Sequence, residues 1–300
     1  MISVVIPTFR ERGLLKQSID SAINQNYPCL EVLVVDDNHP DSEERKRTEK
    51  VMDFYKDKSN VIYIKHDENK NGAAARNTGI RFSHGEYIAF LDDDDSFLPG
   101  KLIKQYNFMK EHPEFSAVYC FAMIDKKQEP TYPYTGNAIL PLLNNRTKMF
   151  TPTLFFTRSS LIAIGGFDES FKRHQDYELL IKFFDKGYKI GCLQEYLTEI
   201  HPIGGNRLSS KKLEELKNQY LKTFESTIEE IDKERPGSKK QIIANNYASV
   251  FISHLADKNF DRALRVFSHY FIISPIDFMS YLWFFTKSYM TKKWKRVFQF

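Results

Sequence analysis

The sequence predicts an α/β fold, with an open, mostly parallel sheet flanked by helices and then an all-helical C-terminal region. Up to about residue 91, short and almost continuously apolar segments alternate with segments of helical periodicity. Such strands are typical of a parallel sheet that helices cover on both faces. From about residue 209 the strand signals disappear, and helical patterns run almost to the end of the chain.

The expected elements of the first part alternate in type. We expect strands at Ile2–Ile6, Leu30–Val35, Val61–Lys65 and Glu86–Leu91. We expect the intervening helices at Gly13–Asn24, where apolar residues recur on one face, at the charged segment Asp41–Lys58, and at Gly72–Phe82. Right-handed crossovers between such strands give an open sheet.

The middle of the chain is expected to be mixed. Helices are predicted at Leu102–Lys110 and Asp176–Lys186, and strands at Ala117–Met123, Thr153–Phe156 and Lys189–Leu193. The stretch Lys126–Asn145 is rich in Pro, Tyr and Asn without a period, so we expect loops there. The predicted domains are a catalytic domain at 1–207 and a helical region at 208–300, with breaks at Pro236-Gly237 and Ser274-Pro275.

Composition narrows the class of protein. The 300 residues are 42% hydrophobic, which is enough for a packed core, and the net charge of +4 does not call for nucleic acid as a partner. The 3 cysteines are far apart in sequence, which favours a reducing compartment. The N-terminus does not resemble a signal peptide. We therefore expect a cytoplasmic protein, with peripheral contact to the cytoplasmic face of the membrane as an option.

Acidic and aromatic residues follow three of the predicted strands. Pro7-Thr8-Phe9 follows the first, Asp36-Asp37-Asn38 the second, and Asp92-Asp93-Asp94-Asp95 the fourth. In open α/β sheets, ligands bind outside the carboxyl ends of the strands. The sequence therefore predicts that these residues meet at one edge of the sheet.

The run of four aspartates predicts a cation. Adjacent carboxylates repel one another, and Mn²⁺ or Mg²⁺ prefers such oxygen ligands, completing its shell with phosphates and water. A metal with a diphosphate ligand is therefore expected. The alternative is an acidic loop that caps the helix after Pro99, although one Asp would suffice for that. For Asp36-Asp37-Asn38 a turn with a helix cap is the alternative, and for Phe9 it is core packing.

Six segments together identify a family. SVVIPTFR, VVDDN, NGAAARNTGI, GEYIAFLDDDD, GGFDE and QDYEL resemble glycosyltransferase family 2 in order and spacing over residues 1 to about 205. The resemblance implies the GT-A fold and inverting transfer of a sugar from a nucleotide-diphosphate sugar, by family usage UDP-linked, to an acceptor hydroxyl. It also implies a saccharide or lipid-linked saccharide acceptor in cell-surface polysaccharide synthesis.

The resemblance also implies roles for residues on the donor side. Pro7 and Phe9 stand where the family binds the donor's base, with Phe9 stacking on it and Asp37 hydrogen-bonding it. Arg76 resembles the basic residue that faces the nucleotide. Asp92-Asp93-Asp94 resembles the DXD motif, in which Asp93 would lie nearest the ribose and Asp94 would bind Mn²⁺ or Mg²⁺.

Further residues resemble the catalytic side of the family. Asp176 looks like the base, and His201 with Arg207 like a loop that closes over the diphosphate. Arg10 stands where Asn is usual, Gln175 where Glu is common, and the Arg usually found shortly before the His is missing. A purely structural role for His201 therefore stays an alternative.

Rival interpretations stay open at this point. Glu178 is a second candidate base, although residues two apart on a helix do not share a face. A metal-dependent sugar nucleotidyltransferase would share the sheet and cation, but the segment PTFRERG has little glycine for a phosphate loop. A non-catalytic nucleotide-binding scaffold is the third option, and it would leave the acidic edge unexplained.

The C-terminal tail is aromatic and basic. Pro275–Phe300 has no acidic residue after Asp277, and its aromatic residues alternate with Lys and Arg. This pattern is typical of a helix lying at an anionic membrane surface. The alternative is that the aromatic side chains pack on the catalytic domain or on a second subunit, giving a homo-oligomer through the C-terminal helices.

Overall fold

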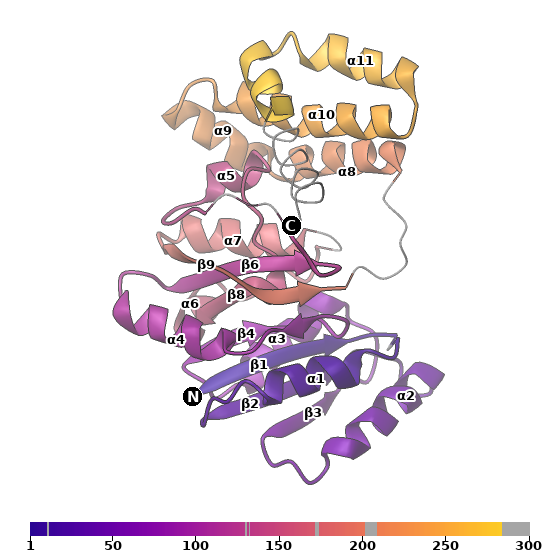
Figure 1. The fold of residues 1–300 in the computed structure, drawn as a ribbon, viewed down its shortest axis with the longest axis vertical. Coiled ribbons are helices and arrows are strands. Elements are labelled where there is room, and N and C mark those ends of the chain that lie inside the picture. Colours follow the sequence, from indigo (N-terminus) through magenta and orange to yellow (C-terminus); the bar gives the residue numbers. More distant parts are fainter. Residues whose placement is uncertain (11, 130, 132, 172–173, 202–208, 284–300) are drawn as a thin grey trace, which may run out of the picture. The chain divides into compact units, whose positions relative to one another are not determined.

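The computed structural model describes residues 1–283 apart from 11, 130, 132, 172–173 and 202–208 (Figure 1). The chain divides into two compact units. The first contains Met1–Ile139 and Lys148–Gly204, and the second contains Leu140–Thr147 and Gly205–Phe300. The predicted boundary between 207 and 208 lies within the stretch 202–208, outside the described residues.

A mixed sheet forms the centre of the first unit. Its strand order is β3-β2-β1-β4-β8-β6-β9-β5, and β7 pairs with β6. The strands are β1 (Ile2–Thr8), β2 (Leu30–Asp36), β3 (Val61–Lys65), β4 (Tyr87–Phe90), β5 (Ser96–Phe97), β6 (Ala117–Ile124), β7 (Lys127–Gln128), β8 (Leu154–Thr157) and β9 (Ile190–Ile200). The predicted α/β fold class is confirmed.

Strand direction divides the sheet into two halves. β1 is parallel to β2 and β4, and β2 is parallel to β3, as the alternation of strands and helices predicts. β8 then lies antiparallel to both β4 and β6, while β6 and β9 are parallel. Parallel pairing therefore joins the first four strands and also β6 with β9, while β8 introduces antiparallel pairs, because an apolar run indicates a strand but not its direction.

Helices flank the sheet of the first unit. They are α1 (Leu15–Ile23), α2 (Glu43–Met52), the 3₁₀ helix η1 (Asp53–Tyr55), α3 (Gly72–Phe82), α4 (Lys101–Glu111), the 3₁₀ helix η2 (Thr151–Thr153), α6 (Arg158–Ala163) and α7 (Gln175–Asp185). The apolar face of α1, with Leu15 and Ile19, packs into a core with Val4 and Val32. Burying such side chains is the main favourable term in holding helix to sheet.

The second unit is helical in its described part. It contains α5 (Ile139–Leu143) apart from its first residue, α8 (Ser210–Thr223), α9 (Glu225–Glu234), α10 (Ser238–Ala256), α11 (Phe260–Tyr270) and a further helical stretch at 275–283. The predicted breaks at Pro236-Gly237 and Ser274-Pro275 are confirmed. The expectation of loops alone at Lys126–Asn145 is wrong, because β7 and α5 lie there. Among the described helices, none is both long and apolar enough to cross a membrane.

Candidate active site

The carboxyl ends of β1, β2 and β4 meet, as the sequence predicts. The Thr8 hydroxyl donates to Asp93 Oδ2 at 2.6 Å, and the Phe9 amide approaches the same oxygen at 3.4 Å. The Arg10 amide donates to Asn38 Oδ1 at 2.8 Å. Asp93 thus ties the acidic run after β4 to the end of β1, and Asn38 ties the end of β2 to the same turn.

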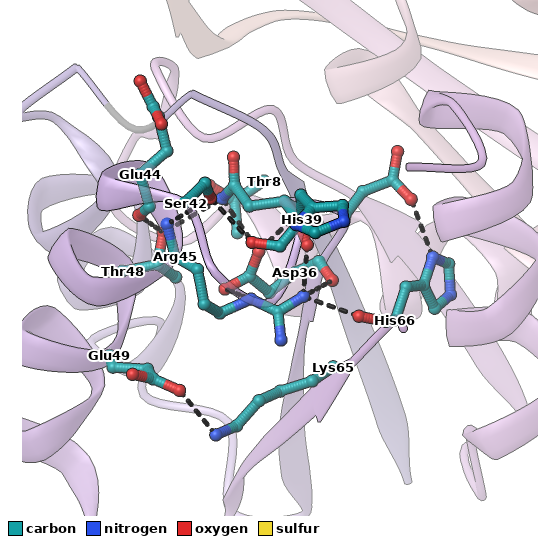
Figure 2. Close-up of polar contacts among 12 residues, drawn as sticks. Thr8, Asp36, His39, Ser42, Glu44, Arg45, Thr48, Glu49, Lys65 and His66 are labelled. Atoms are coloured by element: carbon teal, nitrogen blue, oxygen red, sulfur yellow. Dashed lines mark hydrogen bonds and ion pairs between the residues drawn. The ribbon is translucent and has the colours of Figure 1, made fainter. Parts of the chain in front are cut away.

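Asp36 belongs to the scaffold of this edge. Its fully buried carboxylate forms an ion pair with Arg45 Nε at 3.0 Å, and the Tyr63 hydroxyl donates to it at 2.6 Å. Figure 2 shows Arg45 reaching from α2 to Asp36 and to the His66 carbonyl, which it contacts at 2.7 Å. Sequence reasoning missed Arg45, because it lies in a charged helical run that is typical of a solvent-exposed face.

Asp37 is also enclosed by the protein, with a residue exposure of 1%. One carboxylate oxygen contacts His66 Nδ1 and the Lys70 amide, each at 2.8 Å. The other accepts from Asn69 Nδ2 and the Asn71 amide, each at 2.8 Å. The carboxylate therefore organises the turn 66–71 that leads into α3, which leaves little capacity for the contact with the donor's base that the resemblance implies.

The acidic run after β4 is crowded with like charges. Burial is the main cause that raises the pKa of Asp93 to about 7, with Asp94 and Asp92 adding to it. Burial, followed by Asp92, raises the pKa of Asp95 to about 8 and also raises the pKa of Asp94. A positive charge among these groups would favour their ionised forms, which is what a cation site requires.

The described residues fit a cation held by few protein ligands. No group of three or more His, Cys, Asp or Glu side chains in the part of the chain that the structure describes is arranged to enclose a metal. Asp94 is partly exposed, whereas Asp95 is buried and accepts from the His201 amide at 2.9 Å. Asp92 and Asp93 are also partly exposed, but Asp92 is bonded to Arg76 and Asp93 to the Thr8 hydroxyl. Asp94 is thus the candidate oxygen ligand, and Mg²⁺-type sites commonly combine one or two carboxylates with substrate phosphates.

Arg76 connects the acidic run with α7. Its guanidinium donates to Asp92 Oδ1 at 2.6 Å and to Gln175 Oε1 at 3.0 Å. It also lies 5.5 Å from the centre of the Phe167 ring. One cation thus bridges the residue that opens the DXD-like run and the residue that precedes the proposed base.

Asp176 lies in the same electrostatic environment. Burial raises its pKa to about 6, against the opposing effects of a hydrogen bond from the Tyr177 amide and the charge of Arg76, while Asp92 adds to the rise. Arg76 and Asp92, which are bonded to each other, therefore act on Asp176 in opposite directions. A carboxylate with a pKa near 6 is ionised at neutral pH and still basic enough to accept a proton.

Glu178 is engaged elsewhere, as expected for a residue two positions from Asp176. Its side chain is buried and forms an ion pair with Lys182 at 3.1 Å. Its other oxygen accepts from the Asp168 amide at 3.2 Å. These contacts join α7 to the segment after α6 and give Glu178 a structural role.

The remaining predicted residues lie at the edge of the sheet or outside the described part. Phe9 is 43% exposed, with the Arg10 guanidinium 4.9 Å from its ring centre, so core packing does not explain it. Pro7 lies in β1 opposite Val35. His201 Nδ1 contacts the Asp94 carbonyl at 3.0 Å, which places the imidazole beside the acidic run. Arg207 lies outside the described residues.

Comparison with known structures supports the fold assignment. TarS 1-349 of S. aureus in complex with UDP-GlcNAc superposes with a TM-score of 0.59 at 16% identity, covering 90% of this chain and 91% of that one. The longer TarS structure gives 0.59 at 18% identity, covering 83% of this chain and 43% of that one. The first unit therefore has the GT-A fold, and helices follow it in this chain.

Sequence relatives point to one family. An uncharacterised glycosyltransferase of Methanocaldococcus jannaschii is 30% identical over 233 residues, 74% of this chain and 79% of that protein. One of Rickettsia prowazekii is 31% identical over 199 residues, 61% of this chain and 58% of that protein. TuaG of Bacillus subtilis, whose name assigns it to teichuronic acid biosynthesis, is 32% identical over 114 residues, 37% of this chain and 42% of that protein. The family model described as Glycosyl transferase family 2 matches residues 3–167, and the chain belongs to this family.

Proposed function

We propose that this glycosyltransferase moves a sugar from a UDP-sugar to an acceptor hydroxyl with inversion of the anomeric configuration. The observation that carries the proposal is the bridge made by Arg76, which joins Asp92 to Gln175 beside Asp176. This bridge supports the proposal because it links α7, which carries Asp176, to the acidic run. A nucleotide diphosphate bound at that run would then lie near a proton acceptor.

The donor would lie along the carboxyl ends of β1, β2 and β4. Phe9 offers an exposed ring face for the base, and Asp92 and Asp93 lie where the ribose and diphosphate would follow. Mn²⁺ or Mg²⁺ would be held by Asp94 together with the diphosphate, and when bound it would stabilise the charge of the leaving group. His201 and Arg207 are proposed to contact the diphosphate from the segment after β9.

The proposed chemistry is a single displacement. Asp176 accepts the proton of the acceptor hydroxyl as that oxygen bonds to the anomeric carbon. The bond from the anomeric carbon to the diphosphate oxygen breaks at the opposite side, and the nucleoside diphosphate leaves. Arg76 faces the developing negative charge, and its bond to Gln175 keeps the guanidinium in place.

Asp37 is proposed to act by positioning. Its hydrogen bonds to the Lys70 and Asn71 amides fix the start of α3, and α3 carries Arg76. A loss of this carboxylate would therefore misplace the guanidinium without removing a donor contact. The four hydrogen bonds of its carboxylate to the protein support this positioning role, beside the contact with the donor's base that the resemblance implies.

The substrate class rests on relatives. A TarS structure contains UDP-GlcNAc, and TuaG is named for the synthesis of teichuronic acid. The TarS title supports a UDP-sugar donor, and the name of TuaG concerns a cell-surface polysaccharide, so we propose a saccharide or lipid-linked saccharide acceptor in cell-surface polysaccharide synthesis. A nucleotidyltransferase is less well supported, because the segment after β1 lacks a glycine-rich phosphate loop.

A donor panel tests this proposal. UDP-, TDP- and GDP-sugars are incubated with the protein and Mn²⁺, and release of nucleoside diphosphate is measured. We expect hydrolysis of at least one UDP-sugar, lost when EDTA is added. Release of pyrophosphate from a nucleoside triphosphate and a sugar phosphate, with no hydrolysis of any nucleotide sugar, would instead establish the nucleotidyltransferase.

A further inference from the structure

The last described helix of the second unit has one buried face. Residues 275–283 are helical, and Phe278 and Tyr281 are 0% and 6% exposed. They pack in a cluster with Ala244 and Ala248 of α10. The helix is therefore fixed to the unit by an aromatic face, and its rotation about its own axis is defined.

The polar side chains near this buried face are held as well. Asp277 accepts hydrogen bonds from Gln241 at 2.8 Å and from Ser274 at 2.5 Å. The Ser280 hydroxyl accepts from Arg146 at 3.1 Å. The one acidic side chain of the helix is therefore directed to partners within the unit.

The opposite face is apolar and exposed. Ile272, Ile276, Met279 and Trp283 are 76%, 83%, 50% and 62% exposed. They recur at steps of four, three and four residues, so from 275 onward they share one side of the helix. Isolated exposed apolar residues are ordinary, but a row of them at helical spacing marks an interaction surface. We name these four residues the apolar stripe.

The charge of the sequence after Asp277 indicates which kind of partner suits the apolar stripe. After Asp277 the chain contains no Asp or Glu, while Lys287, Lys292, Lys293, Lys295 and Arg296 are all basic. A second copy of this chain would bring the same positive charges to the contact, and they would repel. An anionic lipid surface has the complementary charge, and it accepts apolar side chains between its headgroups.

We propose that the apolar stripe docks on an anionic membrane surface, with helix 275–283 lying in the plane of the headgroups. Ile276 and Met279 enter the apolar boundary, and the positive charge of the sequence after the helix favours acidic headgroups. Asp277 faces the unit and does not oppose this contact. The proposal concerns the second unit and does not rest on the proposed function.

Vesicle flotation of the full chain tests the proposal. Vesicles of phosphatidylcholine alone are compared with vesicles that also contain phosphatidylglycerol. We expect the unaltered chain to float with the anionic vesicles and much less with the neutral ones. The double variant Ile276→Asp/Met279→Asp should lower the bound fraction by at least about tenfold, because it places charges in the membrane-facing row.

One control variant and one charge variant separate the effect of the apolar stripe from that of the basic residues. Ile162→Asp alters a residue of α6 in the first unit that is 53% exposed, and it should float like the unaltered chain. Lys292→Gln/Lys293→Gln/Lys295→Gln/Arg296→Gln should abolish the preference for anionic vesicles, since each basic charge near the surface contributes about fivefold. Added salt should weaken binding in the same direction.

Several outcomes would overturn the proposal. Equal flotation of the stripe variant and the unaltered chain would remove the stripe from the contact. A second copy of this chain would be the occupant if two results are found together. The unaltered chain would not float with either kind of vesicle, and sedimentation velocity would show an oligomer that the stripe variant turns into a monomer. Circular dichroism and thermal melting of each variant show whether a loss of flotation reflects unfolding.

Discussion

The neutral side chain of Gln175 limits the negative charge around the proposed base, Asp176. Its amide oxygen accepts from Arg76 at 3.0 Å, and its amide nitrogen donates to the Phe171 carbonyl at 2.7 Å. Because Gln is neutral, Arg76 shares its charge with Asp92 alone among the side chains bonded to it. Asp92 is therefore not joined by a second negative charge at position 175 beside Asp176.

The pH profile of transfer should therefore depend on position 175. The pKa of Asp176 is raised to about 6 mainly by burial, so kcat/KM should fall as the pH drops through about 6 and the base becomes protonated. Gln175→Glu adds a negative charge and should move this acid limb up by roughly one pH unit. Gln175→Met, which is neutral, should leave the limb in place. An acid limb that does not move in Gln175→Glu would show that Asp176 does not govern it.

Asp94 should carry the metal dependence of donor binding. Its carboxylate is partly exposed and is the proposed ligand, whereas Asp92 is bonded to Arg76, Asp93 to the Thr8 hydroxyl and buried Asp95 to the His201 amide. Asp94→Asn should lower the affinity for UDP in the presence of Mn²⁺ by at least about tenfold, because a neutral amide is a poorer ligand for a hard cation. Calorimetry with Mn²⁺ and with EDTA is the measurement. Equal affinity of the variant and the unaltered chain in Mn²⁺ would exclude Asp94 as a ligand.

At the scale of elements, α3 begins at a residue with an unusual backbone conformation. Asn71 has φ 89° and caps the helix, with its side-chain oxygen accepting from the Ala73 and Ala74 amides at 2.9 and 3.2 Å. Its own amide donates to Asp37. The start of the helix that carries Arg76 therefore depends on one residue that tolerates positive φ and also supplies a cap.

Two substitutions at Asn71 separate these effects. Asn71→Gly keeps the positive φ and loses the cap, so it should cost a few tenths of a kcal/mol in the free energy of unfolding. Asn71→Ala loses the cap and strains the backbone, and should cost about 2 kcal/mol. Denaturant unfolding measures both. If the two variants are equally stable, backbone strain at position 71 does not contribute to the difference in the free energy of unfolding.

Elements with a strong period were predictable, and short ones were not. The sequence predicts α3 with the bounds that the structure has, because its polar start and buried small residues are distinct. The predicted helix Asp41–Lys58 is longer than α2, which gives way to the 3₁₀ helix η1 at Asp53. α5 was missed, since five residues with Pro141 among them show no helical period.

The whole molecule shows what a linear pattern can and cannot predict about a site. The meeting of Asp37, Asp93 and Thr8 follows from strand order, because the ends of parallel neighbours share an edge. The enclosure of Asp37 by the turn 66–71 and the bridge from Arg76 to Gln175 depend on side-chain directions that periodicity does not encode. Arg45 was missed for the same reason.

The substitution Asp176→Asn is the sharpest test of Asp176 as the base that takes the acceptor's proton. Asp176→Asn keeps the shape of the side chain and most of its capacity to accept the hydrogen bond from the Tyr177 amide, but it cannot take up the acceptor's proton. The measurement is the rate of sugar transfer alongside the affinity for the donor and the melting temperature. We expect transfer at least about 10²-fold slower, with donor affinity and melting temperature nearly unchanged. Transfer at close to the rate of the unaltered protein would contradict it, and would show that another group removes the proton.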